Sequence, residues 1–193
     1  MNNPINEEIK NNYVTFEGLL KNRKYTVEKH IYLNEKKPNR KDTNFYNDVL
    51  SYKPHKVHLI IEARQDVATC FRFKLRCEHF TKVPYFRFDS DGATHRNINK
   101  NLPLVEQVVT TPHFNSFDED GNSIAYKTVE LKDNTTRDIL LKDISLCFAH
   151  FCHETNIRYP EEDFSEVIPY PSSMLPLDIK YDDPLANVDF DGQ

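Results

Sequence analysis

Hydrophobic and polar residues alternate most strictly between Cys70 and His79. Every second position there is apolar, and the positions between them are charged. The apolar set is Phe71, Phe73, Leu75 and Cys77, and the charged set is Arg72, Lys74, Arg76 and Glu78. Successive side chains of a β-strand point to opposite faces of its sheet. This period of two therefore predicts a strand with one buried face and one solvated face.

Several other segments also favour β-structure. Residues 25–33 and 57–63 are rich in β-branched, aromatic and other apolar side chains, and residues 85–89 follow a proline. Residues 114–117 and 124–131 flank Asp118–Asn122, whose Asp-Gly pair suits a tight turn. Asn34–Tyr46 is polar and basic and is predicted as a loop, while residues 5–11 are predicted as a short helix or an irregular lead. The strands together predict a curved antiparallel sheet.

One segment has helical periodicity. Thr136 is a candidate N-cap. The apolar residues that follow at helical spacing are Leu140, Ile144, Cys147, Phe148 and Phe151. This stripe is predicted to pack across the inner face of the sheet. The predicted fold class is therefore α+β, with a curved antiparallel sheet packed against one main amphipathic helix.

The composition changes after Pro160. Residues 161–193 contain nine acids and one base, which gives this segment a net charge near −8, whereas residues 1–160 hold 24 bases and 21 acids. Four prolines interrupt the acidic segment. We interpret residues 1–160 as a single α+β domain and residues 161–193 as an extended, Pro-rich, acidic C-terminal tail.

The chain of 193 residues has no apolar run near the roughly 18 to 20 residues that cross a bilayer. Its first residues lack both a basic patch and an apolar segment, so no signal peptide and no membrane partner are expected. The four cysteines are expected to be reduced thiols. Abundant Asn and Lys suggest a bacterial or phage origin, and hence the cytoplasm of a bacterial host cell. The oligomeric state stays open.

Basic residues are concentrated between Lys53 and Arg87, where eight bases stand against three acids and aromatic residues lie among them. A basic strand face with interleaved aromatic side chains suits a polyanion such as RNA. The predicted nucleic-acid-binding residues are Arg72, Lys74, Arg76, Arg87, Arg96 and Asn97. The alternative is a sheet with an ordinary solvated face.

Two histidines, His95 and His113, lie near predicted strand ends, where a sheet can present both to one cleft. Metal-independent RNA cleavage uses such a pair, because one imidazole takes the 2′-hydroxyl proton and the other protonates the leaving 5′-oxygen. A nearby cation stabilises the charged phosphorane. The candidate catalytic residues are His95, His113, Tyr126 and Lys127. The alternative is that both histidines are hydrogen-bonded structural side chains.

Metal chemistry is the main rival to the histidine pair. The carboxylates that could carry it are Asp89, Asp91, Asp118 and Asp120. Asp118–Asn122 begins like a calcium loop, but Ser123 stands where that loop needs glycine and Val129 where it needs glutamate. Cysteine and histidine recur on the helix at Cys147, His150 and His153 without the paired Cys spacings of zinc sites. No metal is assigned. No cofactor is expected either, because the chain has four glycines and no Walker or dinucleotide-binding motif.

The segments Thr94–Asn97 and Thr111–Lys127 resemble a family of small proteins carried by Gram-positive mobile elements and phages. The family's signature is His-x-Asn, a spacer, Pro-His-x-His, an acidic turn and Ala-Tyr, and the likeness covers roughly residues 70–155. This chain departs from the signature at Asn115, where the second histidine of Pro-His-x-His would stand. The matching positions are His95, Asn97, His113 and Tyr126.

Proteins of this size and setting also resemble anti-CRISPR inhibitors of Cas9, some of which truncate its guide RNA. The resemblance implies RNA cleavage or guide-RNA interference, with guide RNA and Cas9 as partners. Two alternatives remain. One is a non-enzymatic inhibitor whose acidic tail mimics nucleic acid in the basic groove of a nuclease, and the other is a ribonuclease toxin of a toxin–antitoxin pair. Whether the chain is an enzyme stays open at this stage. If it is one, the expected activity is that of a metal-independent endoribonuclease.

Overall fold

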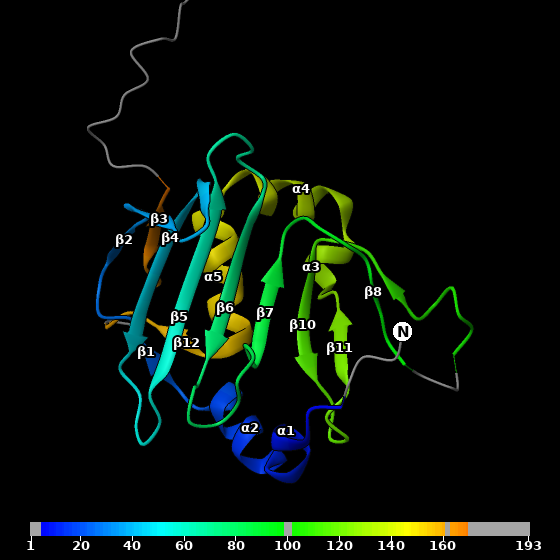
Figure 1. The fold of residues 1–193 in the computed structure, drawn as a ribbon. Coiled ribbons are helices and arrows are strands. Elements are labelled where there is room, and N and C mark those ends of the chain that lie inside the picture. The colour runs from blue at the N-terminus through cyan, green and yellow to red at the C-terminus, as the bar shows by residue number, and fades with distance from the viewer. Residues whose placement is uncertain (1–4, 99–101, 161–162, 170–193) are drawn as a thin grey trace, which may run out of the picture.

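The computed structural model describes residues 5–98, 102–160 and 163–169. Its main element is an antiparallel sheet of seven strands in the order β11-β10-β7-β6-β5-β4-β3 (Figure 1). In chain order these strands are β3 (Glu35–Lys37), β4 (Arg40–Leu50), β5 (Val57–Arg64), β6 (Phe71–Arg76), β7 (Phe86–Asp89), β10 (His113–Phe117) and β11 (Ser123–Tyr126). The predicted α+β class, with a mostly antiparallel sheet, is confirmed.

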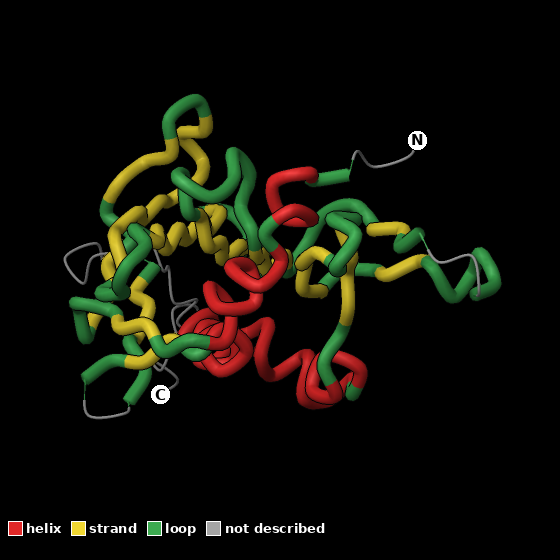
Figure 2. The backbone as a smooth tube through the Cα atoms, turned by 90° about the horizontal axis from the view of Figure 1, so that it is seen from below, coloured by secondary structure: helices red, strands yellow, loops and turns green. Residues whose placement is uncertain are grey.

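Shorter elements surround this sheet. The helices are α1 (Glu7–Asn11), α2 (Tyr13–Lys21), α3 (Val129–Lys132), α4 (Asn134–Lys142) and α5 (Ile144–Thr155). Three two-stranded sheets pair β1 (Lys24–Tyr25) with β12 (Ile157–Arg158), β2 (His30–Tyr32) with β13 (Glu166–Ile168), and β8 (His95–Arg96) with β9 (Val108–Val109). The β8–β9 hairpin projects from one side of the body in both views (Figures 1 and 2).

We call the face of the main sheet that packs on α5 the inner face, and the opposite one the outer face. The alternation in β6 is confirmed, because Phe71, Phe73 and Leu75 are buried while the charged residues between them remain partly exposed. The Phe73 ring lies 5.3 Å from Phe148 and 5.4 Å from Phe151 of α5, measured between ring centroids. In Figure 1 the helix runs behind the strands. The core thus lies between the inner face and this helix.

The helical prediction requires two corrections. The N-cap of α4 is Asp133 and not Thr136, because the Asp133 carboxylate accepts a hydrogen bond from the Thr136 backbone N–H. The single helix is also interrupted at Asp143. The Asp143 side chain accepts hydrogen bonds from the backbone N–H groups of Ser145 and Leu146 and so starts a second helix, α5. Two N-caps therefore divide one apolar stripe between two helices.

Some strand predictions were also wrong. Asn34–Tyr46 is not a loop, since it supplies β3 and the first half of β4. β4 forms although much of it is polar, because eight of its residues, 43 to 50, pair with β5, and this tertiary pairing overrides the weak β-propensity of its polar residues. Residues 25–33 form β1 and β2 rather than one strand. The strand predicted over 124–131 ends at Tyr126, because Thr128 caps α3.

Lys24 is a fully buried amine that no pattern in the sequence announced. Its Nζ donates hydrogen bonds to the carbonyls of Leu19, Leu20 and Asn22 at 2.7, 3.1 and 2.7 Å. Carbonyls in the last turn of a helix have no partner within the helix, so this amine satisfies the C-terminus of α2. Burial lowers the pKa of Lys24 to about 7.

The proposed boundary at residue 160 does not coincide with the last described element. β13 pairs in parallel with β2, and Val167 is part of the hydrophobic core. Residues 170–193, most of the predicted tail, lie outside the described residues.

Replacing Phe73 with alanine should lower the free energy of unfolding by about 3 to 5 kcal/mol, because the cavity would open between the sheet and α5. Denaturant unfolding measures this loss. Val14→Ala, at an exposed position of α2, is the control and should change the value by no more than about 0.5 kcal/mol. A loss at Phe73 as small as the control's would contradict the described core.

Replacing Lys24 with methionine should cost about 1 to 3 kcal/mol of unfolding free energy, because buried carbonyls would lose their donor while the volume is kept. Lys21→Met removes an exposed lysine of α2 that is paired with Glu17, and it should leave stability nearly unchanged. Thermal unfolding of the two variants distinguishes the loss of the hydrogen bonds that Lys24 donates to α2 from a general effect of removing one positive charge. Equal melting temperatures would refute the role given to Lys24.

Candidate functional site

A buried carboxylate, Asp89, organises the centre of the outer face. It lies at the end of β7 and is 6% exposed. Arg87 donates from Nε to Asp89 Oδ2 at 2.7 Å, and Asn115 donates to the same oxygen at 2.8 Å. The Nε of Arg72 lies 3.2 Å from Oδ1. Antiparallel pairing of β7 with β6 and β10 brings these side chains to one point, since Asp89 stands opposite both Arg72 and His113.

A second buried carboxylate, Glu62 on β5, repeats this arrangement on the other side of β6. Lys74 donates to its Oε1 at 2.5 Å, and Lys37 lies 2.7 Å from Oε2. Burial opposes the ionisation of Glu62, but the hydrogen bonds from Lys37 and Lys74 outweigh it and lower its pKa. The cations in contact with Asp89 and Glu62 are Arg72, Arg87, Lys74 and Lys37. Four cations surround two carboxylates, so the cluster carries excess positive charge.

The two predicted histidines lie together on this face. The ring centroids of His95 and His113 are 6.4 Å apart, with the planes inclined at 69°. His95 Nε2 lies 3.1 Å from the carbonyl oxygen of Ser123. Because a carbonyl only accepts, a neutral His95 carries its proton on Nε2 and its lone pair on Nδ1. The structure therefore brings the pair together and defines which nitrogen of His95 can act as a base.

His113 is the more buried histidine of the pair. It is only 2% exposed, its Nδ1 has no hydrogen-bond partner among the described residues, and its Nε2 is 3.9 Å from Asp89 Oδ2. Burial lowers the pKa of His113, although the Thr110 backbone and the Asp89 carboxylate act in the opposite direction. A buried neutral ring behind His95 can position that residue, but it does not face solvent.

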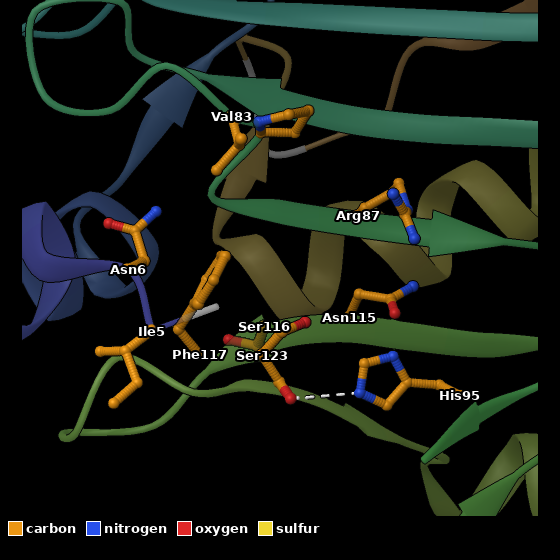
Figure 3. A pocket seen from close by; sticks show the side chains of 10 residues that line it. Ile5, Asn6, Val83, Arg87, His95, Asn115, Ser116, Phe117 and Ser123 are labelled. Atoms are coloured by element: carbon orange, nitrogen blue, oxygen red, sulfur yellow. Dashed lines mark hydrogen bonds between the residues drawn. The ribbon is translucent and has the colours of Figure 1, made fainter. Parts of the chain in front are cut away.

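A hollow of about 500 Å³ opens beside His95. Arg87, Asn115 and His95 come from three different elements and lie near one another in the hollow (Figure 3). Its apolar lining is contributed by Ile5, Val83, Pro84 and Phe117. A ligand with a polar or anionic group near Arg87 and an apolar surface near the apolar lining would find suitable contacts in this hollow.

The remaining predicted catalytic residues do not join the histidines. Tyr126 stands opposite Phe114 in the β10–β11 ladder and donates to Glu154 of α5 at 3.1 Å, so it belongs to the inner face. Burial raises the pKa of Tyr126, and Glu154 adds to this effect. Lys127 donates to the Thr110 hydroxyl at 3.1 Å and does not line the hollow.

The predicted nucleic-acid-binding residues divide into two groups. Arg72, Lys74 and Arg87 lie together on the outer face, as described above. Arg76 donates to the Lys82 carbonyl at 3.2 Å, and Arg96 is an exposed residue of the β8–β9 hairpin. Asn97 has a structural partner: its side-chain amide accepts from the Ala125 N–H at 2.7 Å and donates to the Ala125 carbonyl at 2.8 Å.

The carboxylates of the rival metal site do not converge. Asp89 binds cations, whereas Asp118 Oδ1 accepts from the backbone N–H groups of Asp120 and Asn122 and shapes the β10–β11 turn. Within residues 5–98, 102–160 and 163–169, no group of three His, Cys, Asp or Glu side chains is arranged to hold a metal ion. Cys147 is buried, and His150 lies 3.0 Å from the Thr128 hydroxyl, so the helix residues have other surroundings.

Three site residues were missed by the sequence analysis: Lys37, Glu62 and Ser123. The period of two offered a signal for Glu62, since it falls between buried residues of the 57–63 strand and must face outward with Arg72. Lys37 and Ser123 gave no such signal, because Lys37 lay in a predicted loop and Ser123 acts through its backbone carbonyl.

Folding stability should fall as the pH drops below about 6.5, the ordinary histidine pKa. The fold holds His113 neutral with a lowered pKa, so the unfolded chain binds more protons in this range and is favoured. His113→Phe keeps an aromatic ring without a titrating nitrogen and should weaken this dependence between pH 7 and pH 5. The control is His153→Ala at an exposed position of α5. Denaturant unfolding at each pH tests the prediction, and an unchanged slope in His113→Phe would contradict it.

Comparison with known proteins identified no relative of this chain. No protein-family model, no curated protein and no solved structure matches the chain. Among the described residues, no helix has both the length and the apolar character needed to cross a membrane.

Proposed function

We propose that the chain binds RNA on the outer face of its sheet and cleaves it beside His95. The observation that carries the proposal is the gathering of His95, His113 and Arg87 beside a cluster in which cations outnumber carboxylates. Cations that replace the counterions of a phosphate backbone supply most of the affinity for nucleic acid. The hollow beside Arg87 gives that backbone a defined place.

The cleavage step uses the nucleophile that RNA carries. His95 Nδ1 takes the proton from a 2′-hydroxyl, and the 2′-oxygen forms a bond to the adjacent phosphorus. The bond from phosphorus to the 5′-oxygen breaks, and the departing oxygen takes a proton from water. The products are a 2′,3′-cyclic phosphate and a 5′-hydroxyl end. Arg87, oriented by Asp89, stabilises the negative charge on the phosphorane. His113 is a positioning residue in this scheme, because it is buried against the His95 ring.

Guide RNA of Cas9 is the substrate that the likeness to anti-CRISPR inhibitors suggests, and the cleavage would take place in the cytoplasm of a bacterial host. A ribonuclease toxin would use the same chemistry on cellular RNA. The burial of His113 favours a second candidate, a non-enzymatic inhibitor that occupies guide RNA or Cas9 without cleaving, because only one ring of the pair then faces the hollow.

The test is incubation of the full chain with guide RNA, with and without Cas9 and with and without a chelator, followed by sizing of the RNA. Cleavage should persist in chelator and yield a cyclic phosphate end. His95→Ala should reduce the rate by about 10²-fold or more, while RNA binding is retained. His153→Ala, on the helix behind the sheet, should cleave normally. Binding of RNA without any cleavage would refute the nuclease and support the non-enzymatic inhibitor. Cleavage that is independent of His95 would refute the proposed site.

A further inference from the structure

A second hollow, of about 270 Å³, lies on the outer face next to the first one. The side chains of Arg72, Lys74 and Arg87 line it, together with Asp89 and the loop residues 91–93. Arg87 lines both hollows, so the two adjoin at this side chain. Asp91, which is exposed at the rim, is the other carboxylate of this lining.

Asp89 fixes the direction of both guanidinium groups in this hollow. It contacts Arg87 and Arg72 through their Nε atoms, at 2.7 and 3.2 Å. Neither guanidinium has an Nη hydrogen bond to another described side chain or carbonyl. The Nη–H groups of each guanidinium therefore remain available to donate hydrogen bonds to a further acceptor. The oxygens of Asp89 are already occupied by Arg72, Arg87 and Asn115, which reduces their repulsion of an incoming anion.

The loop after β7 approaches this hollow with its backbone. Gly92 has a φ of +136°, a conformation that side chains rarely allow, and a Cβ placed on it would lie 3.3 Å from an Nη of Arg72. A glycine here lets the loop come close to the guanidinium without covering it. The hollow is thus a small polar space whose lining includes three cationic side chains.

We propose that this second hollow is a phosphate subsite, which holds the phosphate next to the one at His95 on the same RNA strand. Paired guanidinium forks match the oxygens of a phosphate and bind them bidentately. The identity of the strand rests on the proposed function, whereas phosphate binding itself does not depend on cleavage. The proposal implies that the ligand needs two adjacent phosphates. A strand-end phosphate and an internal phosphodiester share this chemistry, so the experiment separates them.

The experiment measures binding of a short 2′-O-methyl RNA, which lacks the nucleophile and stays intact, by fluorescence anisotropy at several salt concentrations. Arg72→Gln should weaken binding about tenfold and reduce the salt dependence by about one phosphate contact. Arg72→Lys keeps the charge but loses the fork, and it should also weaken binding. Arg137→Gln, on α4, is the control for loss of one positive charge and should bind normally. If Arg72→Lys binds as tightly as the unmodified chain, the subsite is overturned.

Asp89→Asn gives the sharpest contrast. It makes the face more positive, so simple charge attraction predicts tighter binding, whereas loss of the oriented forks predicts weaker binding. Melting temperatures confirm that each variant is folded. If Asp89→Asn does not fold, the binding of Arg72→Lys alone tests the subsite. RNA with a 5′-phosphate is compared with RNA ending in a 5′-hydroxyl: a preference for the first identifies a strand end, and equal binding identifies an internal phosphodiester.

A nuclear magnetic resonance titration with inorganic phosphate separates this inference from the proposed cleavage. Phosphate should shift the Arg72 Nε–H signal, identified by its loss in Arg72→Lys, and His95→Ala should leave that shift intact. A shift without RNA cleavage would refute the nuclease and retain the subsite. If neither phosphate nor the 2′-O-methyl RNA perturbs this signal, the subsite is wrong even where cleavage is observed.

Discussion

The structure depends on the burial of one aromatic layer. Phe71, Phe73, Phe88 and Phe114 line the inner face of three adjacent strands, and Phe148 and Phe151 of α5 close over them. Because side chains alternate along a strand, burying these rings requires every intervening residue of β6 and β7 to face outward. The positive charge of the outer face is thus fixed by the packing of the opposite face. A shift of the register by one residue would turn the aromatic rings out to solvent and the charges into the core.

Charges gathered in this way repel one another, and the buried carboxylates are what make the arrangement tolerable. Asp89 and Glu62 each bind two cations drawn from different strands, so they cross-link the sheet as well as neutralise it. A buried carboxylate is stable only when it is paired and hydrogen-bonded, and these two are. The same contacts set the orientation of the side chains that would meet a ligand. Stability and recognition on this face therefore share the same atoms.

The sequence predicted the features that repeat and missed those that depend on distant partners. Alternation identified β6 and its two faces. It could not identify β4, whose polar residues become a strand only through pairing with β5. The orientation of Tyr126 could have been predicted from the sequence. The turn at 118–122 sets Tyr126 opposite Phe114, and hence on the inner face. The proximity of His95 to His113 was a correct expectation. The burial of His113 was not foreseeable, because it depends on side chains distant in the sequence, such as His95 and Asp89, that lie beside its ring in the fold.

The two edges of the sheet have features that oppose pairing with another chain. An unpaired edge strand presents free N–H and C=O groups to which another chain can add. β3 limits this risk by being three residues long and charged throughout, as Glu-Lys-Lys. β11 uses another device: Asn97 takes up both backbone groups of Ala125, and His95 takes up the carbonyl of Ser123. Two side chains thus imitate the next strand without continuing it. His95 and Asn97 also end the sheet, so losing them would leave β11 open as a template for aggregation.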